Sequence, residues 1–341
     1  MIISDKKLIM VGLANNKTSL GEVFRRYVKC FDSFCKPDVF DLQPYIKNEN
    51  MKIDLMPSYK GAFDHDVKYF HSSFHLYQGI KRQTKPSERN EKVKKIGYFV
   101  WESSELHDKD TETLKDFDEV WTASEYCKGI FEQYIDPSCI KVIPHPIPFP
   151  KTKPKKYKKF TLLIMGNISS NINRKNLEAN IEVAKIIAKK YKNINVILKT
   201  FTLNDQEKSI LKKLVDNSKI KVIDEYLSSQ KTQELIGKSH MILSLHRSEG
   251  FGLTLAEAMA VDTIPVATGY SGNLQFMKDE DLLVDYKLVD VTDSYFRGQW
   301  AEPDIHDAID KIDNAIKNKK EIQSIDFLSY SNISNLIKEN I

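Results

Sequence analysis

The chain has 341 residues, of which 41% are hydrophobic and 29% are charged, and this balance indicates a folded globular protein of about two domains. A net charge of +4 is too small for a protein that binds nucleic acid through its charge, so we expect no nucleic-acid partner. No apolar run approaches the roughly 20 residues that cross a bilayer, so we expect no membrane-spanning helix.

The cysteines and the first residues bear on location. The four cysteines, at positions 30, 35, 127 and 139, have no zinc-ligand spacing, and a chain of this size needs no disulfides. The opening MIISDKKLIMVGLA lacks the cationic and long apolar regions of a signal peptide, so we expect a cytoplasmic protein. Lysines gather at residues 92–95 and 151–159. These clusters are either a solvated surface or a peripheral contact with anionic lipids at the inner face of the membrane.

The first elements in the chain are a buried strand over residues 7–13 and a helix that begins near Ser19. Gly12 lies at the end of this strand, and Gly21 lies at the start of the helix. Further on, Asp64-His65-Asp66 resembles a metal-binding D-x-D motif. So short a pattern is common by chance, and no glycine-flanked strand end surrounds it. We therefore expect no metal site.

Three apolar segments follow, at residues 96–102, 119–122 and 141–147, and each is expected to be a strand of a parallel sheet. The first of them ends in Trp101 and Glu102. Parallel strands deliver residues to a ligand at their carboxyl ends. Glu102 is therefore a candidate for orienting a substrate or removing its proton.

The second half of the chain follows a segment rich in proline and lysine at residues 146–159, where a domain boundary is expected. Strand and helix patterns then alternate, which predicts a doubly wound parallel sheet. Residues 300–303 are expected to begin a helix that continues to residue 316. We predict an α/β fold with domains at 1–150 and 151–316 and a helical tail at 317–341.

The stretch at residues 241–259, MILSLHRSEGFGLTLAEAM, has the pattern of a strand, a glycine loop and a helix. Gly250 and Gly252 allow the backbone to approach a ligand closely. The first N–H groups of the helix, from Gly252 to Thr254, would then face that ligand with the positive end of the helix dipole behind them. We interpret this arrangement as a site for an anion, namely a phosphate.

Charged side chains complete this expected site. Glu249 and Glu257 bracket the glycine loop, and a carboxylate is a good acceptor for paired sugar hydroxyls. Arg174 and Lys175 lie just beyond the first strand of the second domain, where cations would neutralise a diphosphate. Lys199 and Arg247 are further cationic candidates.

The string HRSEGFGLTLAEAMA, in which Glu249 is followed eight positions later by Glu257, resembles the E-x7-E signature of retaining glycosyltransferases of family 4, the group 1 family. YFVWE, VWTASEY, VIPHPI, GYSGN and QWAEPD are similar to the branch of that family that makes polysaccharides and O-antigen. The resemblance implies a GT-B fold: two facing Rossmann-like domains with parallel doubly wound sheets and an active site in the cleft between them. The family pattern leads us to expect an acidic residue at position 275, and this chain has Gln275 there instead.

The resemblance also implies roles for particular residues. Glu249 would contact the transferred sugar, Glu257 the ribose, Arg174 and Lys175 the diphosphate, and Glu102 the acceptor. The other positions expected to bind the donor are Gly12, Gly21, Gly166, Lys199, Arg247, Gly250, Phe251, Gly252, Leu253, Thr254, Gly272 and Asn273.

The implied activity is metal-independent transfer of a hexose, with retention, from a UDP- or GDP-sugar to a hydroxyl of a growing surface glycan (as in lipopolysaccharide biosynthesis) or a lipid-linked oligosaccharide. No cofactor beyond this donor is expected. Two alternatives stay open. One is a nucleotide-sugar-binding protein without transferase activity, such as an epimerase, a phosphorylase or a silent partner subunit. The other is a transferase that acts on a protein acceptor.

Overall fold

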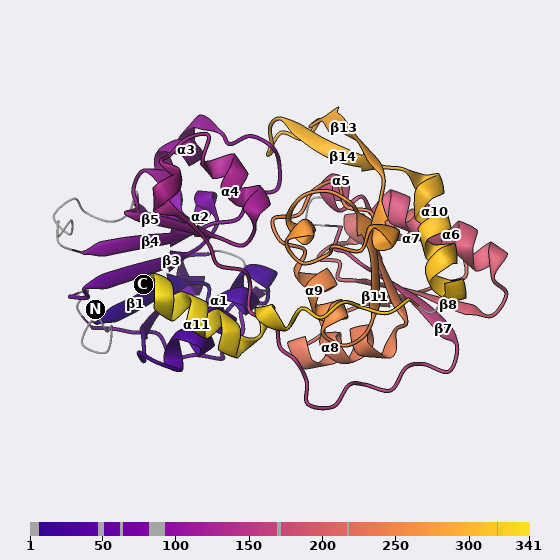
Figure 1. Cartoon of the computed structure of the whole chain (residues 1–341), viewed down its shortest axis with the longest axis horizontal. Helices are drawn as coiled ribbons and strands as arrows, with labels where there is room; N and C mark the ends of the chain where they lie inside the picture. The colour runs from indigo at the N-terminus through magenta and orange to yellow at the C-terminus, as the bar shows by residue number, and fades with distance from the viewer. Residues whose placement is uncertain are drawn as a thin grey trace. The chain divides into compact units, whose positions relative to one another are not determined.

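The computed structural model describes residues 7–46, 51–61, 64–81, 93–168, 172–216, 218–318 and 320–341. The chain divides into two compact units, each built on its own sheet (Figure 1). Unit 1 comprises Met1–Trp101, Leu106–Ile147 and Asp326–Ile341. Unit 2 comprises Glu102–Glu105 and Pro148–Ile325.

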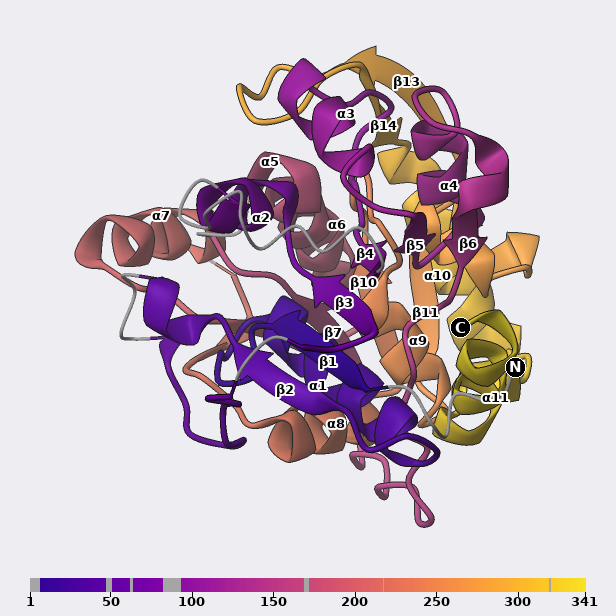
Figure 2. The ribbon, with the colours of Figure 1, turned by 90° about the vertical axis from the view of Figure 1, so that its left-hand side faces the viewer.

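Unit 1 holds a six-stranded sheet in the order β2-β1-β3-β4-β5-β6, with all neighbouring strands parallel (Figure 2). The first strand is buried along its whole length, as its apolar sequence LIMVG predicts. The strands are β1 (Leu8–Gly12), β2 (Asp38–Asp41), β3 (Val67–His71), β4 (Lys94–Tyr98), β5 (Glu119–Thr122) and β6 (Ile140–Val142). The helices are α1 (Ser19–Asp32), α2 (Phe74–Lys81), α3 (Asp108–Leu114), α4 (Glu125–Phe131) and α11 (Tyr330–Asn340).

The last helix of the chain, α11, packs on α1 within unit 1 (Figure 1). The ammonium of Lys29 lies 4.4 Å from the ring centroid of Tyr330, and Oγ of Ser334 donates to the carbonyl oxygen of Cys30 at 3.3 Å. Ile333 and Ile337 of α11 are buried. The end of the chain is therefore part of the core of unit 1.

Unit 2 holds a second six-stranded parallel sheet, in the order β12-β11-β10-β7-β8-β9. Its strands are β7 (Phe160–Met165), β8 (Ile194–Thr200), β9 (Ile220–Asp224), β10 (Met241–Ser244), β11 (Ile264–Thr268) and β12 (Leu283–Val284). Its helices are α5 (Ile172–Lys175), α6 (Leu177–Lys190), α7 (Asp205–Val215), α8 (Ser229–Lys238), α9 (Leu253–Met259) and α10 (Ile305–Asn318). Short 3-10 turns occur in both units. Those of unit 1 are η2 (Gln43–Tyr45), η5 (Pro137–Cys139) and η8 (Asp326–Leu328), and those of unit 2 are η6 (Gly272–Gln275) and η7 (Glu280–Leu282). The predicted α/β class with two parallel, doubly wound sheets is confirmed.

Two sequence-based predictions were wrong in detail. Residues 300–303 do not begin a helix; they belong to strand β14 (Gln299–Pro303), which pairs antiparallel with β13 (Tyr286–Asp290), and helix α10 begins only at Ile305. The strand expected to end at Glu102 ends at Tyr98 instead. Glu102 therefore lies in a connecting segment, and that segment belongs to unit 2. Among the described residues, no helix is long and apolar enough to cross a membrane.

Candidate active site

Four charged side chains of unit 2 form one series of ion pairs. Oε1 of Glu249 lies 3.4 Å from Nη1 of Arg174 and also pairs with Nζ of Lys175. Nε of Arg174 lies 3.0 Å from Oε2 of Glu102. The fold therefore brings together the four residues that the sequence predicted for catalysis.

Neighbouring strands explain why these side chains meet. Arg174 and Lys175 end the short helix α5, which follows β7, and Glu249 lies in the loop after β10. Strands β7 and β10 are parallel neighbours, so their carboxyl ends share one edge of the sheet. Asn176 comes next, in a left-handed conformation with φ of 49°. Its buried Nδ2 finds no hydrogen-bond partner among the described residues, which leaves this N–H group available to a ligand.

The cations set the protonation state of Glu249. Its side chain is 9% exposed, and that of Arg174 is 7% exposed. Burial alone would raise the pKa of Glu249, but the Lys175 ammonium and the Arg174 guanidinium lower this pKa to about 2. Burial raises the pKa of Glu102, against the opposing effect of the Arg174 guanidinium. Glu249 is therefore an ionised hydrogen-bond acceptor, whereas Glu102 holds a proton more readily than an ordinary glutamate.

Two glycine loops, at residues 249–252 and 269–273, fix the backbone of Glu249. Its N–H group donates to Oγ of Ser271 at 2.8 Å, and its carbonyl oxygen accepts from the N–H group of Gly272 at 2.8 Å. A Cβ on Gly272 would lie 2.3 Å from the backbone C and O atoms of Gly250, so the two loops touch where only glycine fits. Gly252 has φ of +86° and directly precedes α9. Gly252 and Gly272 are thus needed by the loop geometry itself.

His246, which was not among the predicted site residues, connects the same loops through hydrogen bonds. Its Nε2 lies 3.1 Å from Oδ1 of Asn273, and Nδ2 of Asn273 donates to the carbonyl oxygen of Thr268 at 3.0 Å. Both side chains are fully buried. In the tautomer protonated at Nε2, the ring donates to this amide oxygen, while Nδ1 lies 3.1 Å from the carbonyl oxygen of Ser244. A histidine directly ahead of the glycine loop is the sequence signal that could have identified it.

The remaining predicted positions on the loop and on α9 differ in exposure. Leu253, Thr254 and Glu257 are partly exposed on α9. Phe251 is buried, and its ring centroid lies 5.1 Å from that of Phe276. Phe251 is thus a core residue beside the loop.

Two further predicted cations contact groups of unit 2 itself. Nε of Arg247 lies 2.5 Å from Oε2 of Glu302, and its Nη1 donates to the carbonyl oxygen of Asn173 at 2.6 Å. Nζ of Lys199 donates to the carbonyl oxygen of Thr200 at 2.7 Å, and burial lowers the pKa of Lys199. Neither is part of the ion-pair series around Arg174.

The space around each backbone shows whether glycine is needed at three further positions that were predicted to bind the donor, Gly12, Gly21 and Gly166. Gly12 and Gly21 belong to unit 1. A Cβ on Gly12 would lie 2.4 Å from the ring of Phe24, and one on Gly21 would lie 2.5 Å from the carbonyl oxygen of Asn16. Gly166, which follows β7 in unit 2, has room for a Cβ. Packing alone thus accounts for glycine at positions 12 and 21.

The D-x-D-like tripeptide takes part in contacts at the edge of unit 1. Asp64 pairs with Lys7 at 2.8 Å, Nε2 of His65 lies 2.9 Å from Asp38, and Asp66 accepts from the N–H group of Lys7 at 2.9 Å. In the part of the chain that the structure describes, no group of three or more His, Cys, Asp or Glu side chains is placed to hold a metal ion.

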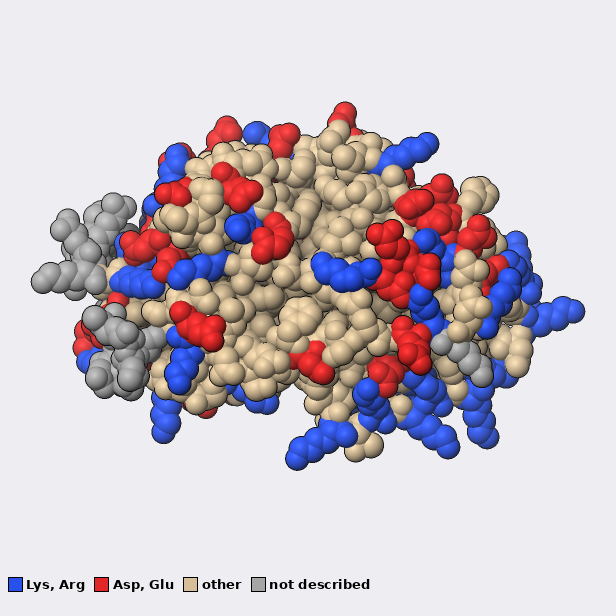
Figure 3. Space-filling view, in the orientation of Figure 1, with Lys and Arg blue, Asp and Glu red and all other residues tan. Residues whose placement is uncertain are grey.

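The two lysine clusters are partly engaged in structural contacts. Lys153 pairs with Asp262 at 2.7 Å, Nζ of Lys156 donates to the carbonyl oxygen of Ser239 at 2.7 Å, and Lys94 pairs with Glu119 at 2.8 Å. Lys92 lies outside the described residues. Basic side chains gather along the lower and outer edge of unit 2 in Figure 3. Several lysines of residues 151–159 are exposed.

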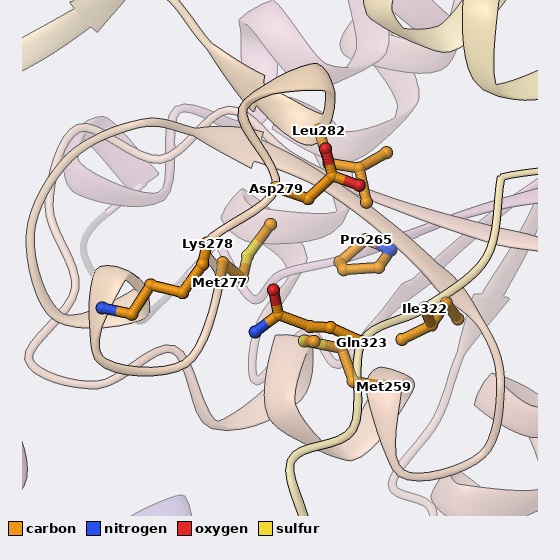
Figure 4. Close-up of a pocket in the computed structure, with 8 residues that line it drawn as sticks. All are labelled: Met259, Pro265, Met277, Lys278, Asp279, Leu282, Ile322 and Gln323. Carbon is orange, nitrogen blue, oxygen red and sulfur yellow. The ribbon is translucent and has the colours of Figure 1, made fainter.

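Unit 2 also has a small pocket (Figure 4). None of the side chains that line it was predicted to bind a substrate. They are Met259, Pro265, Met277, Lys278, Asp279, Leu282, Ile322 and Gln323.

Comparison with known families decides the class of protein. The family described as glycosyl transferases group 1 matches residues 148–326, which is more than half of the chain. The chain belongs to the glycosyl transferases group 1 family. The predicted family is thereby confirmed. A search of curated proteins found no match.

Solved structures share the fold of this chain. HepE of Anabaena, in complex with UDP-glucose, has a TM-score of 0.63 at 11% identity. The match covers 98% of this chain and 95% of the HepE chain. The lipopolysaccharide outer core galactosyltransferase WaaB has a TM-score of 0.62 at 13% identity, with 98% and 100% covered. TarM of S. aureus has a TM-score of 0.55 at 15% identity over 81% of this chain, which spans 51% of its length. At these identities the likeness shows the fold, and the predicted GT-B fold is confirmed.

Proposed function

We propose that this chain is a retaining, metal-independent hexosyltransferase. It would move a hexose from a UDP- or GDP-sugar to a hydroxyl of a growing surface glycan or a lipid-linked oligosaccharide. The observation that carries the proposal is the pairing of Arg174 and Lys175 with one ionised carboxylate, Glu249, beside a glycine loop. Membership of the glycosyl transferases group 1 family supplies the reaction class. UDP-glucose, the ligand of the HepE complex, is the first donor to test.

The cation pair is suited to the leaving group. Breaking the anomeric C–O bond leaves negative charge on the diphosphate and positive charge on the sugar ring. In our proposal the Lys175 ammonium and the Arg174 guanidinium stabilise this departing diphosphate, and preorganised charges of this kind usually contribute more to catalysis than any other single effect. The buried N–H group of Asn176, next in the chain, adds a neutral donor at the same edge of the sheet.

Glu249 is suited to the transferred sugar. Its pKa of about 2 keeps its oxygens ionised at any working pH, so that they can accept hydrogen bonds from sugar hydroxyls. The hydrogen bonds that Ser271 and Gly272 make to its backbone fix where this carboxylate points. On α9, Glu257 takes the ribose hydroxyls in this proposal.

Glu102 is assigned to the acceptor. A carboxylate with a raised pKa is a better proton acceptor near neutral pH than an ordinary one. Glu102 would orient the incoming hydroxyl or take up its proton, while its ion pair with Arg174 connects it to the donor groups.

The test of this proposal is a donor panel. The protein is incubated with UDP- and GDP-hexoses, with and without a lipid-linked oligosaccharide acceptor, and release of the nucleoside diphosphate is measured. We expect release with at least one donor, faster with acceptor, and NMR of the product should show the anomeric configuration of the donor. Release that is equally fast without acceptor would indicate a hydrolase. The absence of release with every donor would favour a silent nucleotide-sugar-binding subunit.

A further inference from the structure

One strand of the β13–β14 hairpin is joined to the segment that carries Glu102. The indole Nε1 of Trp300 donates to the carbonyl oxygen of Glu102 at 3.0 Å. The N–H group of Gln299 donates to Oγ of Ser104 at 2.7 Å. Glu105 and Arg297 form an antiparallel bridge just beyond it. All these residues belong to unit 2.

The same strand also contacts the loop next to Arg174. The N–H group of Ala301 donates to the carbonyl oxygen of Arg247 at 2.9 Å, and Glu302 pairs with the guanidinium of Arg247. The N–H group of Arg247 in turn donates to the carbonyl oxygen of Arg174 at 2.8 Å. Strand β14 therefore bonds both to the backbone of Glu102 and to the residue that supports Arg174.

The contact around Trp300 is closely packed. Its side chain is 2% exposed, and its ring centroid lies 5.6 Å from that of Phe296. Gly298 has φ of +80°, and a Cβ there would lie 2.1 Å from Oγ of Ser104. A glycine at this turn is what lets the chain approach the 102–105 segment so closely.

We infer that Trp300 is a positioning residue for the reaction, which holds Glu102 where its carboxylate meets Arg174. The inference rests on the proposed function, because it concerns the groups assigned there to acceptor and donor. The indole fixes the carbonyl end of Glu102, and the side chain of the same residue then reaches Nε of Arg174 at 3.0 Å. Trp300 needs no contact with a substrate for this role. The QWAEP sequence of β14 thus contributes to the reaction indirectly, through the ion pair between Glu102 and Arg174.

The test replaces the indole while keeping an aromatic ring. Trp300→Phe removes the N–H donor to Glu102, and Trp121→Phe is its matched control. Nε1 of the fully buried Trp121 donates to Oε2 of Glu119 at 2.9 Å in unit 1. We expect Trp300→Phe to lower kcat roughly 5- to 10-fold, as befits one lost hydrogen bond, with an unchanged dissociation constant for the nucleoside diphosphate. Trp121→Phe should leave kcat unchanged.

A double-mutant cycle separates positioning from a general loss of structure. In a Glu102→Gln background, Trp300→Phe should have little further effect on kcat, since both changes act through one carboxylate. Ser104→Ala, which removes a second bond to β14 without disturbing the buried indole, should lower kcat in the same way but less. Equal losses in both backgrounds would overturn the inference, and so would a Trp300→Phe enzyme as active as the Trp121→Phe control.

Hydrogen exchange supplies a readout that does not depend on activity. Trp300→Phe should speed amide exchange at residues 102–105, whereas Trp121→Phe should not. If wild-type protein shows no activity with any donor but this exchange pattern holds, the proposed function fails and the structural link stands. If wild-type protein is active but exchange at residues 102–105 is the same in both variants, the inference alone fails.

Discussion

Glu102 and Glu249 contact the same guanidinium, that of Arg174, yet their pKa values shift in opposite directions. Burial raises both pKa values, but Glu249 has Lys175 as a second close cation, which brings its pKa down to about 2. For Glu102 the cations offset the effect of burial only in part, and the nearby negative charge of Glu249 raises its pKa further. One arginine thus stands between a carboxylate that is always ionised and one that can exchange a proton.

The cation pair predicts a large and selective loss on Lys175→Met. Removal of one electrostatic stabiliser of a leaving group should lower kcat roughly 100-fold or more, with a much smaller change in the dissociation constant of the donor. Lys190→Met is a matched control, since Lys190 pairs with Asp313 elsewhere in unit 2. Steady-state kinetics and calorimetry give the two numbers. Equal losses in turnover and donor binding, or an equal effect of the control, would count against the assignment.

The raised pKa of Glu102 predicts how kcat/KM changes at acidic pH. As the pH falls through its raised pKa, Glu102 takes up a proton and can no longer accept one from the acceptor, so kcat/KM should fall. Glu249 should add no step in this range, because its pKa is about 2. Glu102→Gln should be slow at every pH and should lose this acid limb. An unchanged profile in the variant would show that another group titrates.

Glu249 should also contribute to stability in a pH-dependent way. Its pKa is lower in the folded protein than in the unfolded chain, so its contribution is present above the unfolded-state pKa and is lost as the pH falls toward about 2. The shift corresponds to roughly 3 kcal/mol at neutral pH. Thermal midpoints of wild type and Glu249→Gln should therefore converge on acidification. A gap that stays constant with pH would mean that Glu249 stabilises the fold by packing alone.

The contact between the two glycine loops predicts a strong effect of Gly272→Ala. The new Cβ would meet the backbone of Gly250, which cannot rotate away, and overpacking of this kind typically destabilises by about 1–3 kcal/mol. We expect a lower thermal midpoint and weaker donor binding. Gly129→Ala, in helix α4, is the control, because its Cβ would meet nothing within 4 Å and alanine favours a helix. Tolerance of Gly272→Ala would contradict the loop geometry.

Local patterns were sufficient to predict much of the fold and which charged side chains of the candidate site lie close together. The strand, glycine loop and helix around Glu249 form one continuous stretch, so periodicity and glycine placement reveal them. Arg174 and Lys175 follow a clear buried strand, and parallel strands deliver such residues to a common edge. The fold brings these residues to the positions that the sequence suggested.

Long-range pairing was what the sequence could not show. QWAEP at residues 299–303 has the local pattern of a helix start, but it is held as a strand by Val289 opposite Trp300 and by the bond from Ala301 to Arg247. The apolar run that ends at Glu102 looks like one strand, yet pairing stops at Tyr98 and the segment beyond it bonds to β14. Arg247 is far along the sequence from Ala301, and Glu102 is far from Trp300, so propensity alone gave the wrong boundaries.

The most direct test of the account is calorimetric titration of wild type and Glu249→Gln with a nucleotide-sugar and with the matching nucleoside diphosphate. The central claim is that Glu249 holds the sugar while Arg174 and Lys175 hold the diphosphate. It predicts that the variant binds the nucleotide-sugar about 10-fold more weakly, as for a charged hydrogen bond, yet binds the diphosphate at least as well as wild type. If wild type binds no UDP- or GDP-sugar, or if the variant loses both ligands equally, the claim is contradicted.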